Sequence, residues 1–242
     1  MATHKVLSTK KLDPSLIKEA EQTGIKIIEQ EAIKVNPIVS KEKWQEIFQV
    51  LESNKQFVVF TSSNSVYAVK KYLNEYVNPV QPNWKIFSLA GKTRQALEDN
   101  LDAFGTIIAT ADDANALAEK IIAANVDEVI FFCGDRRRDE LPKVLKMAGI
   151  KVHEVVVYET VETPVACKDY YDAVLFFSPS AVNSFFSVNQ LKKDVVCFAI
   201  GRTTADSIAA ACGSKIIISK TPAQEILLQE VINYFKRVVN QG

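Results

Sequence analysis

Short runs of β-branched and aromatic residues alternate along this chain with longer stretches of helical periodicity. β-branched and aromatic residues favour strands, whereas apolar residues spaced three or four apart favour amphipathic helices. On this basis we predict strands at 5–8, 25–30, 57–61, 85–89, 106–109, 128–133, 151–158, 173–177, 195–200 and 215–219. Strands that alternate with helices are typical of a parallel sheet covered by helices, so we expect an α/β fold.

The chain also matches itself. Residues 6–29 align with residues 131–154 at a constant offset of 125, which places Gly24-Ile25 opposite Gly149-Ile150. The correspondence continues where 59–66 resembles 175–182 and 90–93 resembles 200–203. This self-similarity predicts a duplicated unit of five strands, and therefore two similar domains, each a parallel β-sheet flanked by helices.

The sequence indicates the domain boundaries less directly than it indicates the duplication. A tandem repeat would divide the chain near residue 125, but no flexible linker lies there. The pattern breaks instead at 31–40, which contains Asn36-Pro37, and at 160–169, which contains Thr163-Pro164. We therefore favour an interleaved arrangement in which the first domain comprises 1–36 plus 163–242 and the second comprises 37–162. The extended run 155–158 is expected to pair with the other crossing as a two-stranded β hinge.

Charge and composition exclude several classes of partner. The 29 basic and 29 acidic residues give a net charge of zero, so the chain has no broad positive field for nucleic acid. No window approaches the roughly 18 unbroken apolar residues of a membrane span, and the first residues lack the apolar core of a signal peptide. The four cysteines are far apart, as expected for reduced thiols. We expect a cytoplasmic protein without a nucleic-acid or membrane partner.

Polar and glycine-containing segments follow the predicted strands. Ligands of open parallel sheets bind at the carboxyl ends of the strands, where helix N-termini present backbone N–H groups to anions. The candidate binding residues in these segments are Ser62, Ser63, Asn64, Gly91, Thr93, Gly134, Asp135, Arg136, Ser178, Ser180, Gly201, Thr203 and Thr204. The alternative is that these residues only cap helices.

The arginines favour the binding interpretation. Five of the six arginines in the chain lie in these segments or in the adjoining helix turns, namely Arg94, Arg136, Arg137, Arg138 and Arg202. The guanidinium group suits bidentate contact with carboxylate or phosphate, so a multiply charged anion held between two domains is a reasonable ligand. For the run 136–138 the alternative is a solvated surface.

Other familiar chemistry is absent from the sequence. The glycine-rich signatures of nucleotide-binding proteins and the nucleophile elbow of hydrolases do not occur. The two histidines, His4 and His153, do not cluster with cysteines or carboxylates at metal-ligand spacing. We therefore expect neither a metal nor a cofactor, which leaves either an enzyme without an evident nucleophile or no enzyme at all.

Five short segments together resemble uroporphyrinogen-III synthases, in the same order and over nearly the whole chain. They are Phe-Thr-Ser-Ser-Asn-Ser-Val at 60–66, Gly-Asp-Arg-Arg-Arg-Asp-Glu-Leu-Pro at 134–142, Val-Tyr-Glu-Thr at 157–160, Phe-Ser-Pro-Ser-Ala-Val at 177–182 and Ala-Ile-Gly-Arg-Thr-Thr-Ala at 199–205. The resemblance implies a cofactor-independent enzyme of two α/β domains. It would cyclise the linear tetrapyrrole hydroxymethylbilane to uroporphyrinogen III as a monomer in heme biosynthesis.

The resemblance also implies roles for single residues. Tyr158 matches the tyrosine of the family and would be a proton donor or an orienting hydrogen bond, whereas the alternative is a tyrosine that only packs. Thr203 and Thr204 match the Gly-x-Thr-Thr segment. The chain departs from the family at Arg94, which replaces a small residue of the first-repeat loop. The main rival function is a hinged two-domain protein that binds a small polyanion without catalysis.

Overall fold

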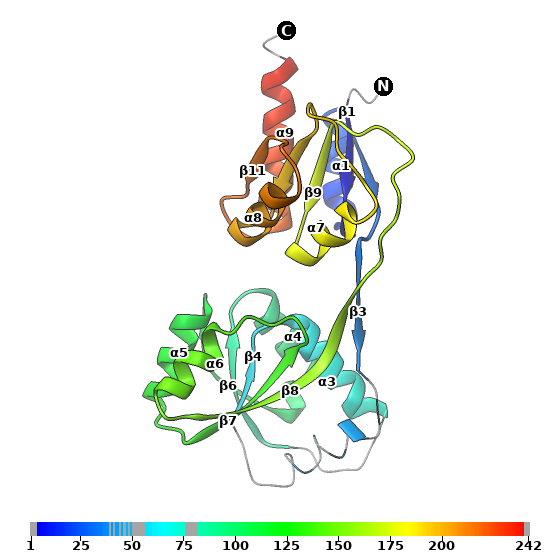
Figure 1. Cartoon of the computed structure of the whole chain (residues 1–242). Helices are drawn as coiled ribbons and strands as arrows, with labels where there is room; N and C mark the ends of the chain where they lie inside the picture. Colours follow the sequence, from blue (N-terminus) through cyan, green and yellow to red (C-terminus); the bar gives the residue numbers. More distant parts are fainter. Residues whose placement is uncertain are drawn as a thin grey trace. The chain divides into compact units, whose positions relative to one another are not determined.

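The computed structural model describes residues 4–38, 57–75 and 82–239, with residues 40, 42, 43, 45, 47 and 49 between the first two ranges. The chain divides into two compact units (Figure 1). The discontinuous unit consists of Met1–Lys34 and Val161–Gly242, and the inserted unit is Val35–Thr160. Residues 1–3, where the first predicted domain begins, lie outside the described residues. Both units are α/β, as predicted.

The discontinuous unit is built on a sheet of five parallel strands in the order β11-β10-β9-β1-β2. The strands are β1 (His4–Ser8), β2 (Ile25–Glu29), β9 (Ala173–Phe176), β10 (Val196–Ala199) and β11 (Ile216–Ile218). The connecting helices are α1 (Pro14–Gln22), α7 (Pro179–Phe186), α8 (Arg202–Ala211) and α9 (Gln224–Val239).

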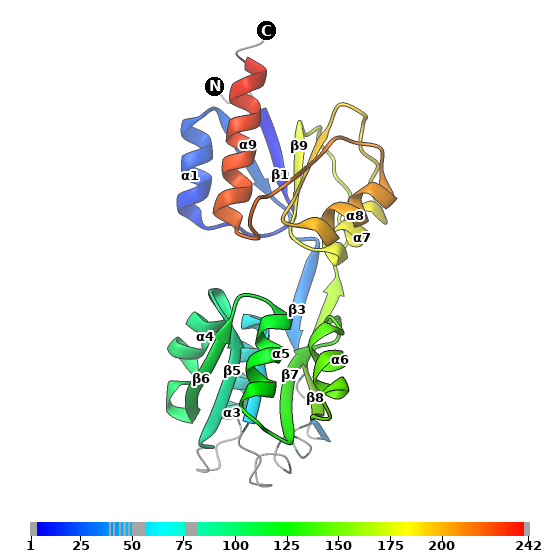
Figure 2. The same ribbon diagram turned by 90° about the vertical axis from the view of Figure 1, so that its left-hand side faces the viewer.

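Alternation along these strands places a helical layer on each face of the sheet. Val6 and Phe198 pack with α1 and α9 on one face, while Leu7 and Phe176 pack with α7 and α8 on the other. Figure 2 shows the two helix pairs on opposite sides of the strands. Because successive side chains of a strand point to opposite faces, strands covered on both faces are apolar at nearly every position.

The inserted unit has a six-stranded sheet in the order β3-β8-β7-β4-β5-β6. The strands are β3 (Ile33–Pro37), β4 (Phe57–Phe60), β5 (Trp84–Leu89), β6 (Gly105–Ala111), β7 (Glu128–Gly134) and β8 (Lys151–Glu162). The helices are α3 (Ser63–Glu75), α4 (Lys92–Asn100), α5 (Ala114–Ala123) and α6 (Glu140–Met147), with a 3-10 turn η1 at Asp102–Phe104.

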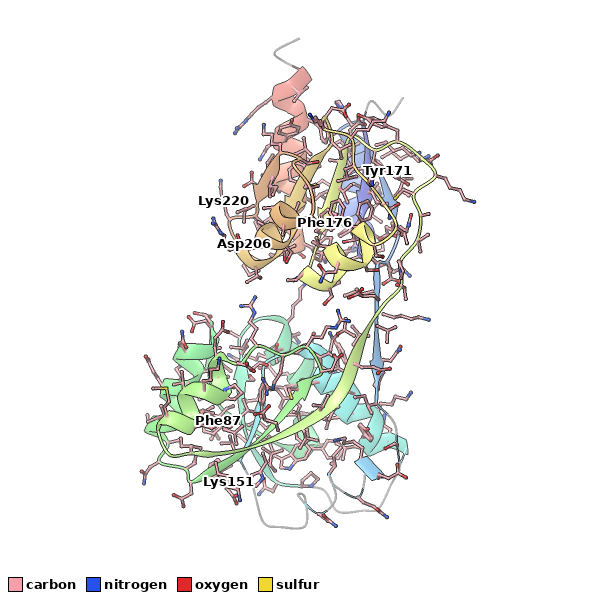
Figure 3. All side chains as sticks on the ribbon, viewed as in Figure 1. Phe87, Lys151, Tyr171, Phe176, Asp206 and Lys220 are labelled. Atoms are coloured by element: carbon pink, nitrogen blue, oxygen red, sulfur yellow. The ribbon has the colours of Figure 1, made fainter. Side chains whose placement is uncertain are left out.

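The inserted unit likewise has two cores, one on each face of its sheet. Phe60 and Phe132 pack with α3 and α4, and Phe87 and Phe131 pack with α5 and α6. The fully buried Phe87 of the inserted unit and Phe176 of the discontinuous unit are both labelled in Figure 3. Each unit therefore has a hydrophobic core of its own.

The strand orders confirm the predicted duplication. The order β2-β1-β9-β10-β11 in the discontinuous unit corresponds to β8-β7-β4-β5-β6 in the inserted unit. The segments that align in sequence, 6–29 with 131–154 and 59–66 with 175–182, occupy equivalent strands and helices. A tandem division would separate β4 from β7, but these strands pair in parallel, so the repeats are interleaved.

Both chain crossings fall in two neighbouring strands, β3 and β8. The Ile38 N–H donates to the Val157 carbonyl and the Thr163 N–H donates to the Ala32 carbonyl, each at 2.9 Å. The residue numbers in these two pairs change in opposite directions, which is the pattern of an antiparallel ribbon. The boundaries expected from the sequence, after residues 36 and 162, lie within β3 and at the last residue of β8.

The ten predicted strands match the strands of the described residues except β3, but 155–158 was expected to pair with this crossing as a two-stranded hinge, and the pairing of β3 with β8 confirms that expectation. Asn36-Pro37 and the mixed polarity of this segment resemble a turn more than a strand. Because β3 is an edge strand, the missing N–H of Pro37 breaks no internal ladder and proline is tolerated there. Within the described residues, no helix is long and apolar enough to cross a membrane.

Candidate functional site

The carboxyl ends of the strands of the inserted unit surround a pocket of ≈ 510 Å³. Three of the residues predicted from the sequence line it, Ser62 after β4, Gly134 at the end of β7 and Tyr158 in β8. The remaining lining residues are Thr61, Leu89, Asp112, Asp113, Ala114, Asn115, Phe131, Arg137, Arg138, Glu140 and Leu141. A pocket at this edge is what a parallel sheet of this kind predicts.

Tyr158 projects from β8 toward the start of α3. Its hydroxyl donates to Ser62 Oγ at 3.3 Å. Burial raises the pKa of Tyr158, and its hydrogen bonds with Ser62 and Asn64 oppose this shift only in part. The phenol is therefore protonated at neutral pH, as a proton or hydrogen-bond donor must be.

Ser62 connects the tyrosine to the first turn of α3. Its Oγ accepts the Asn64 N–H at 3.2 Å, and its carbonyl accepts both the N–H and the hydroxyl of Ser65. Ser63 and Asn64, the other two candidates of this loop, begin α3 and are half-buried. They lie beside the pocket but are not among its lining residues. The helix-capping interpretation thus applies to Ser62, which leaves its hydroxyl shared between the helix and Tyr158.

The turn after β7 contacts the backbone of β8 at Tyr158 and at Thr160. The Asp135 N–H donates to the Tyr158 carbonyl at 3.1 Å, and Asp135 Oδ1 accepts the Thr160 N–H at 2.9 Å. Arg136 is exposed, with its Nε 3.9 Å from Asp135 Oδ2. Only Gly134 of these three candidates lines the pocket.

Acidic neighbours partner several of the arginines. Arg94 pairs with Glu98 at 2.7 Å and Arg202 with Asp206 at 3.1 Å, each one helical turn further along. These pairs are exposed and contribute little, about 0–1 kcal/mol each, so a carboxylate ligand could compete with them.

In the run 136–138 the sequence analysis selected Arg136, but the arginines that line the pocket are Arg137 and Arg138. Arg137 forms ion pairs with Asp139 and Glu154. Which arginine of a run faces a pocket depends on the turn that carries it, and that turn is formed by the packing of α6 on β7.

Thr93 and Thr204 are buried, whereas Gly91 and Thr203 are exposed. Gly91 precedes α4 at the end of β5, in the left-handed conformation, with φ of 65°. Gly201 precedes α8 in an extended conformation and leaves the N-terminus of that helix without a side-chain cap.

The remaining candidates begin α7. The Ser178 Oγ accepts the Ala181 N–H at 3.2 Å as the N-cap of α7, and Ser180 lies half-buried in the first turn. Two pockets of the discontinuous unit, ≈ 390 and ≈ 460 Å³, lie at the opposite edge of its sheet, beside the end of α7. Neither pocket is lined by the predicted residues.

Residues 14–229 match the family described as uroporphyrinogen-III synthase HemD. The chain belongs to the uroporphyrinogen-III synthase family. The family predicted from the five sequence segments is therefore confirmed. Membership supports the enzymatic interpretation, that of a cyclising synthase of tetrapyrrole biosynthesis, and does not favour a binding protein without catalysis.

Two solved structures share the fold. Uroporphyrinogen-III synthetase from Helicobacter pylori is 16% identical with a TM-score of 0.71, and the match covers 96% of this chain and 100% of that one. A mutant uroporphyrinogen III synthase from the extremely thermophilic bacterium Thermus thermophilus is 15% identical with a TM-score of 0.65, and the match covers 99% of this chain and 100% of that one. At such identities these likenesses establish the fold of this synthase-family chain.

Sequence reasoning missed the 112–115 segment, which contributes four lining residues to the pocket. Asp113 is the N-cap of α5, where its Oδ1 accepts the N–H groups of Asn115 and Ala116. An aspartate that follows a predicted strand and precedes a helical stretch is itself an N-cap signal. That signal could have identified the end of β6 as part of the predicted ligand-binding edge.

The described residues contain no group of three or more histidine, cysteine or carboxylate side chains that could hold a metal ion. His153 lies 2.8 Å from Glu128. Burial raises the pKa of the Cys133 thiol to about 11 and that of Cys197 further still. These two thiols are therefore protonated at neutral pH and poor nucleophiles.

Proposed function

We propose that this chain cyclises hydroxymethylbilane to uroporphyrinogen III with inversion of ring D and net loss of water. Loss of the ring-A hydroxyl leaves an electrophilic azafulvene. Ring D attacks it through its substituted carbon, and the resulting spiro intermediate fragments and recloses with that ring inverted. The observation that carries the proposal is the match to the synthase family over residues 14–229, together with a protonated Tyr158 at a pocket.

The substrate supplies both nucleophile and electrophile, so the task of the protein is mainly to orient them. Holding two reacting groups in the correct geometry can itself contribute several kcal/mol to catalysis. We assign the substrate carboxylates to the strand-end segments of the two domains, 37–162 and 1–36 plus 163–242. The residues proposed for this are Ser62, Ser63, Asn64, Gly91, Thr93, Gly134, Asp135, Arg136, Ser178, Ser180, Gly201, Thr203 and Thr204.

Tyr158 is the residue assigned to the reacting centre. Its protonated hydroxyl would donate to the departing ring-A hydroxyl and help it leave as water. An ordinary phenol has a pKa near 10 and is a weak acid, so this assistance would amount to about 10²-fold or less.

We further infer that the protein acts as a monomer in the cytoplasm, with no nucleic-acid or membrane partner. The net charge of zero supports the absence of a nucleic-acid partner. A mass near 27.0 kDa by light scattering would support the monomer, and a mass of twice that value would contradict it.

The decisive experiment is incubation with hydroxymethylbilane followed by separation of the product isomers. Unassisted closure gives the uninverted type I ring. A synthase gives the type III ring, at a rate proportional to protein concentration. A protein that only binds the polyanion leaves type I as the sole product, and that result would refute the proposal.

A further inference from the structure

The strand pair that carries Tyr158 is irregular at one point. Cys133 of β7 pairs with Val156 of β8, but the next residue, Gly134, pairs with Tyr158. One residue of β8, Val157, is therefore extra, and its carbonyl accepts the N–H of Ile38, the residue after β3. A bulge of this kind redirects the side chains that follow it. The side chain that follows here is the phenol.

Gly134 leaves the space that the phenol ring fills. A Cβ added to Gly134 would lie 2.5 Å from Tyr158 Cε2 and 2.7 Å from the phenol oxygen, and would also meet Cζ. Real Cβ contacts of this length essentially do not occur, so any side chain at 134 must displace the ring. The absence of a side chain at Gly134 therefore allows the Tyr158 ring to occupy this position.

Asp135 fixes the backbone at Tyr158 and two residues beyond it. Its N–H bonds the Tyr158 carbonyl and its carboxylate accepts the Thr160 N–H, two residues further along β8. Ser62 holds the other end of the side chain through the hydroxyl. Tyr158 is therefore held in three ways. The edge of its ring lies against Gly134, Asp135 bonds the backbone of β8 at two points, and Ser62 bonds the hydroxyl.

We propose that Gly134 and Asp135 are positioning residues, which set the place and direction of the Tyr158 hydroxyl for the cyclisation. This inference rests on the proposed function for the role of Tyr158, and for these two residues a positioning role replaces the direct substrate contact proposed above. A carboxylate that already accepts a backbone N–H and carries negative charge is poorly suited to bind the carboxylates of the substrate.

The first test substitutes the glycine. Gly134→Ala should slow formation of the type III ring about as much as Tyr158→Phe does, by up to about 10²-fold, with little change in KM. The double variant Gly134→Ala/Tyr158→Phe should be no slower than Tyr158→Phe, because the group that the glycine positions is already gone. The proposal would be overturned if the rate of the double variant fell by the product of the two single-variant reductions.

Two further glycines serve as controls. Gly213→Ala meets no atom within 4 Å and should leave the rate unchanged. Gly105→Ala places its Cβ 2.7 Å from the Cβ of Trp84 and crowds the backbone there, so it should lower stability without the same loss of kcat in the folded fraction. If Gly105→Ala lost kcat as Gly134→Ala does, general damage would explain both and the proposal would fail.

The second test substitutes the aspartate. Asp135→Ala removes the acceptor for Thr160 and should lower kcat, whereas Asp135→Asn keeps a side-chain oxygen at that position and should restore most of it. Asp102→Ala is the matched control, since Asp102 also accepts a backbone N–H, from Ala103 at 2.8 Å, at the opposite edge of the same sheet. Equal losses in Asp135→Ala and Asp135→Asn would contradict a positioning role.

A spectroscopic measurement tests the placement without any turnover. In protein labelled with carbon-13 at tyrosine Cζ, the resonance absent from Tyr158→Phe belongs to Tyr158. This resonance should shift in Gly134→Ala and Asp135→Ala and stay in place in Gly213→Ala and Asp102→Ala. An unmoved resonance in both folded test variants would overturn the proposal.

Failure to fold is also informative. If Gly134→Ala does not fold, Gly134→Ala/Tyr158→Ala should, because the ring that the new Cβ meets is gone. A double variant that still fails to fold would count against the proposal. If the wild-type protein yields only the type I ring, the proposed function fails, and the Tyr158 resonance still decides whether Gly134 and Asp135 position the ring.

Discussion

At the scale of single residues, the candidate site combines groups that are far apart in the chain and individually weak. Tyr158 is an ordinary phenol, Ser62 an ordinary hydroxyl and Gly134 has no side chain at all. Their arrangement is what distinguishes them, since the phenol is partly buried, protonated and directed at Ser62. Because the activity depends on this arrangement, a substitution that removes a single atom should lower the rate.

Tyr158→Phe should slow type III ring formation by up to about 10²-fold while leaving the fold intact. The phenyl ring fills the same space beside Gly134, and the hydroxyl's hydrogen bonds with Ser62, at 3.3 Å, and with Asn64 are lost. Initial rates of type III formation, together with circular dichroism of the same samples, measure this effect. Unchanged turnover would remove Tyr158 from the mechanism.

The pH dependence of that loss follows from the pKa shift. Because burial holds the pKa of Tyr158 above the ordinary phenol value of about 10, the folded protein keeps this proton until the pH exceeds that value. The ratio of wild-type to Tyr158→Phe rates should therefore be constant between about pH 6 and 9. A ratio that falls across this range would show that the Tyr158 hydroxyl loses its proton there, which would contradict the raised pKa.

At the scale of elements, strand-to-helix junctions supply most of the candidate binding residues. Junctions within each repeat differ in detail: α7 is capped by the side chain of Ser178, whereas α4 and α8 follow Gly91 and Gly201 and have no side-chain cap. A capped N-terminus already uses part of its hydrogen-bonding capacity. The glycine-led helices present theirs to a ligand more freely.

Substitutions at Ser178 can separate capping from substrate binding. Ser178→Ala removes the acceptor for Ala181 and should cost about 1 kcal/mol of stability, measurable by urea unfolding. Ser178→Asp keeps a good N-cap and should preserve stability, but its charge would repel a carboxylate and raise KM. If Ser178→Asp left KM unchanged, Ser178 would be a cap only.

At the scale of the whole molecule, the duplicated architecture gives each unit a complete set of cores. None of the hydrophobic clusters among the described residues combines side chains of both units. The inserted unit is also continuous in sequence, so it can be produced as a single piece. Whether it is independent can be measured directly.

A fragment of residues 35–160 should fold by itself. It retains β4 to β7, most of β8, helices α3 to α6 and both core clusters of the inserted unit. We expect a cooperative urea transition and the circular dichroism of an α/β protein, with no type III ring formation. Phe132→Ala, which empties a fully buried site, should destabilise the fragment by about 3–5 kcal/mol. A fragment without a cooperative transition would show that its stability depends on the other unit.

The prediction from sequence was most accurate where local rules apply. Strands buried on both faces are apolar at almost every position, so their number, type and duplication follow from the pattern. The ten strands read from the pattern do not include β3, whose Pro37 suggests a turn but is tolerated at a sheet edge, although 155–158 was expected to pair with this crossing. The sequence analysis selected Arg136 where Arg137 and Arg138 line the pocket, and it omitted Asp112 and Asp113.

The sequence by itself determined the α/β class, the duplication into two similar domains and the family. These follow from hydrophobic periodicity and short local segments, which do not depend on distant contacts. Only the tertiary structure decided that Gly134 makes room for the Tyr158 ring, that Asp135 holds its backbone and that Ser62 meets its hydroxyl. Those contacts join β7, β8 and the start of α3 beside a one-residue bulge, so spacing along the chain cannot reveal them.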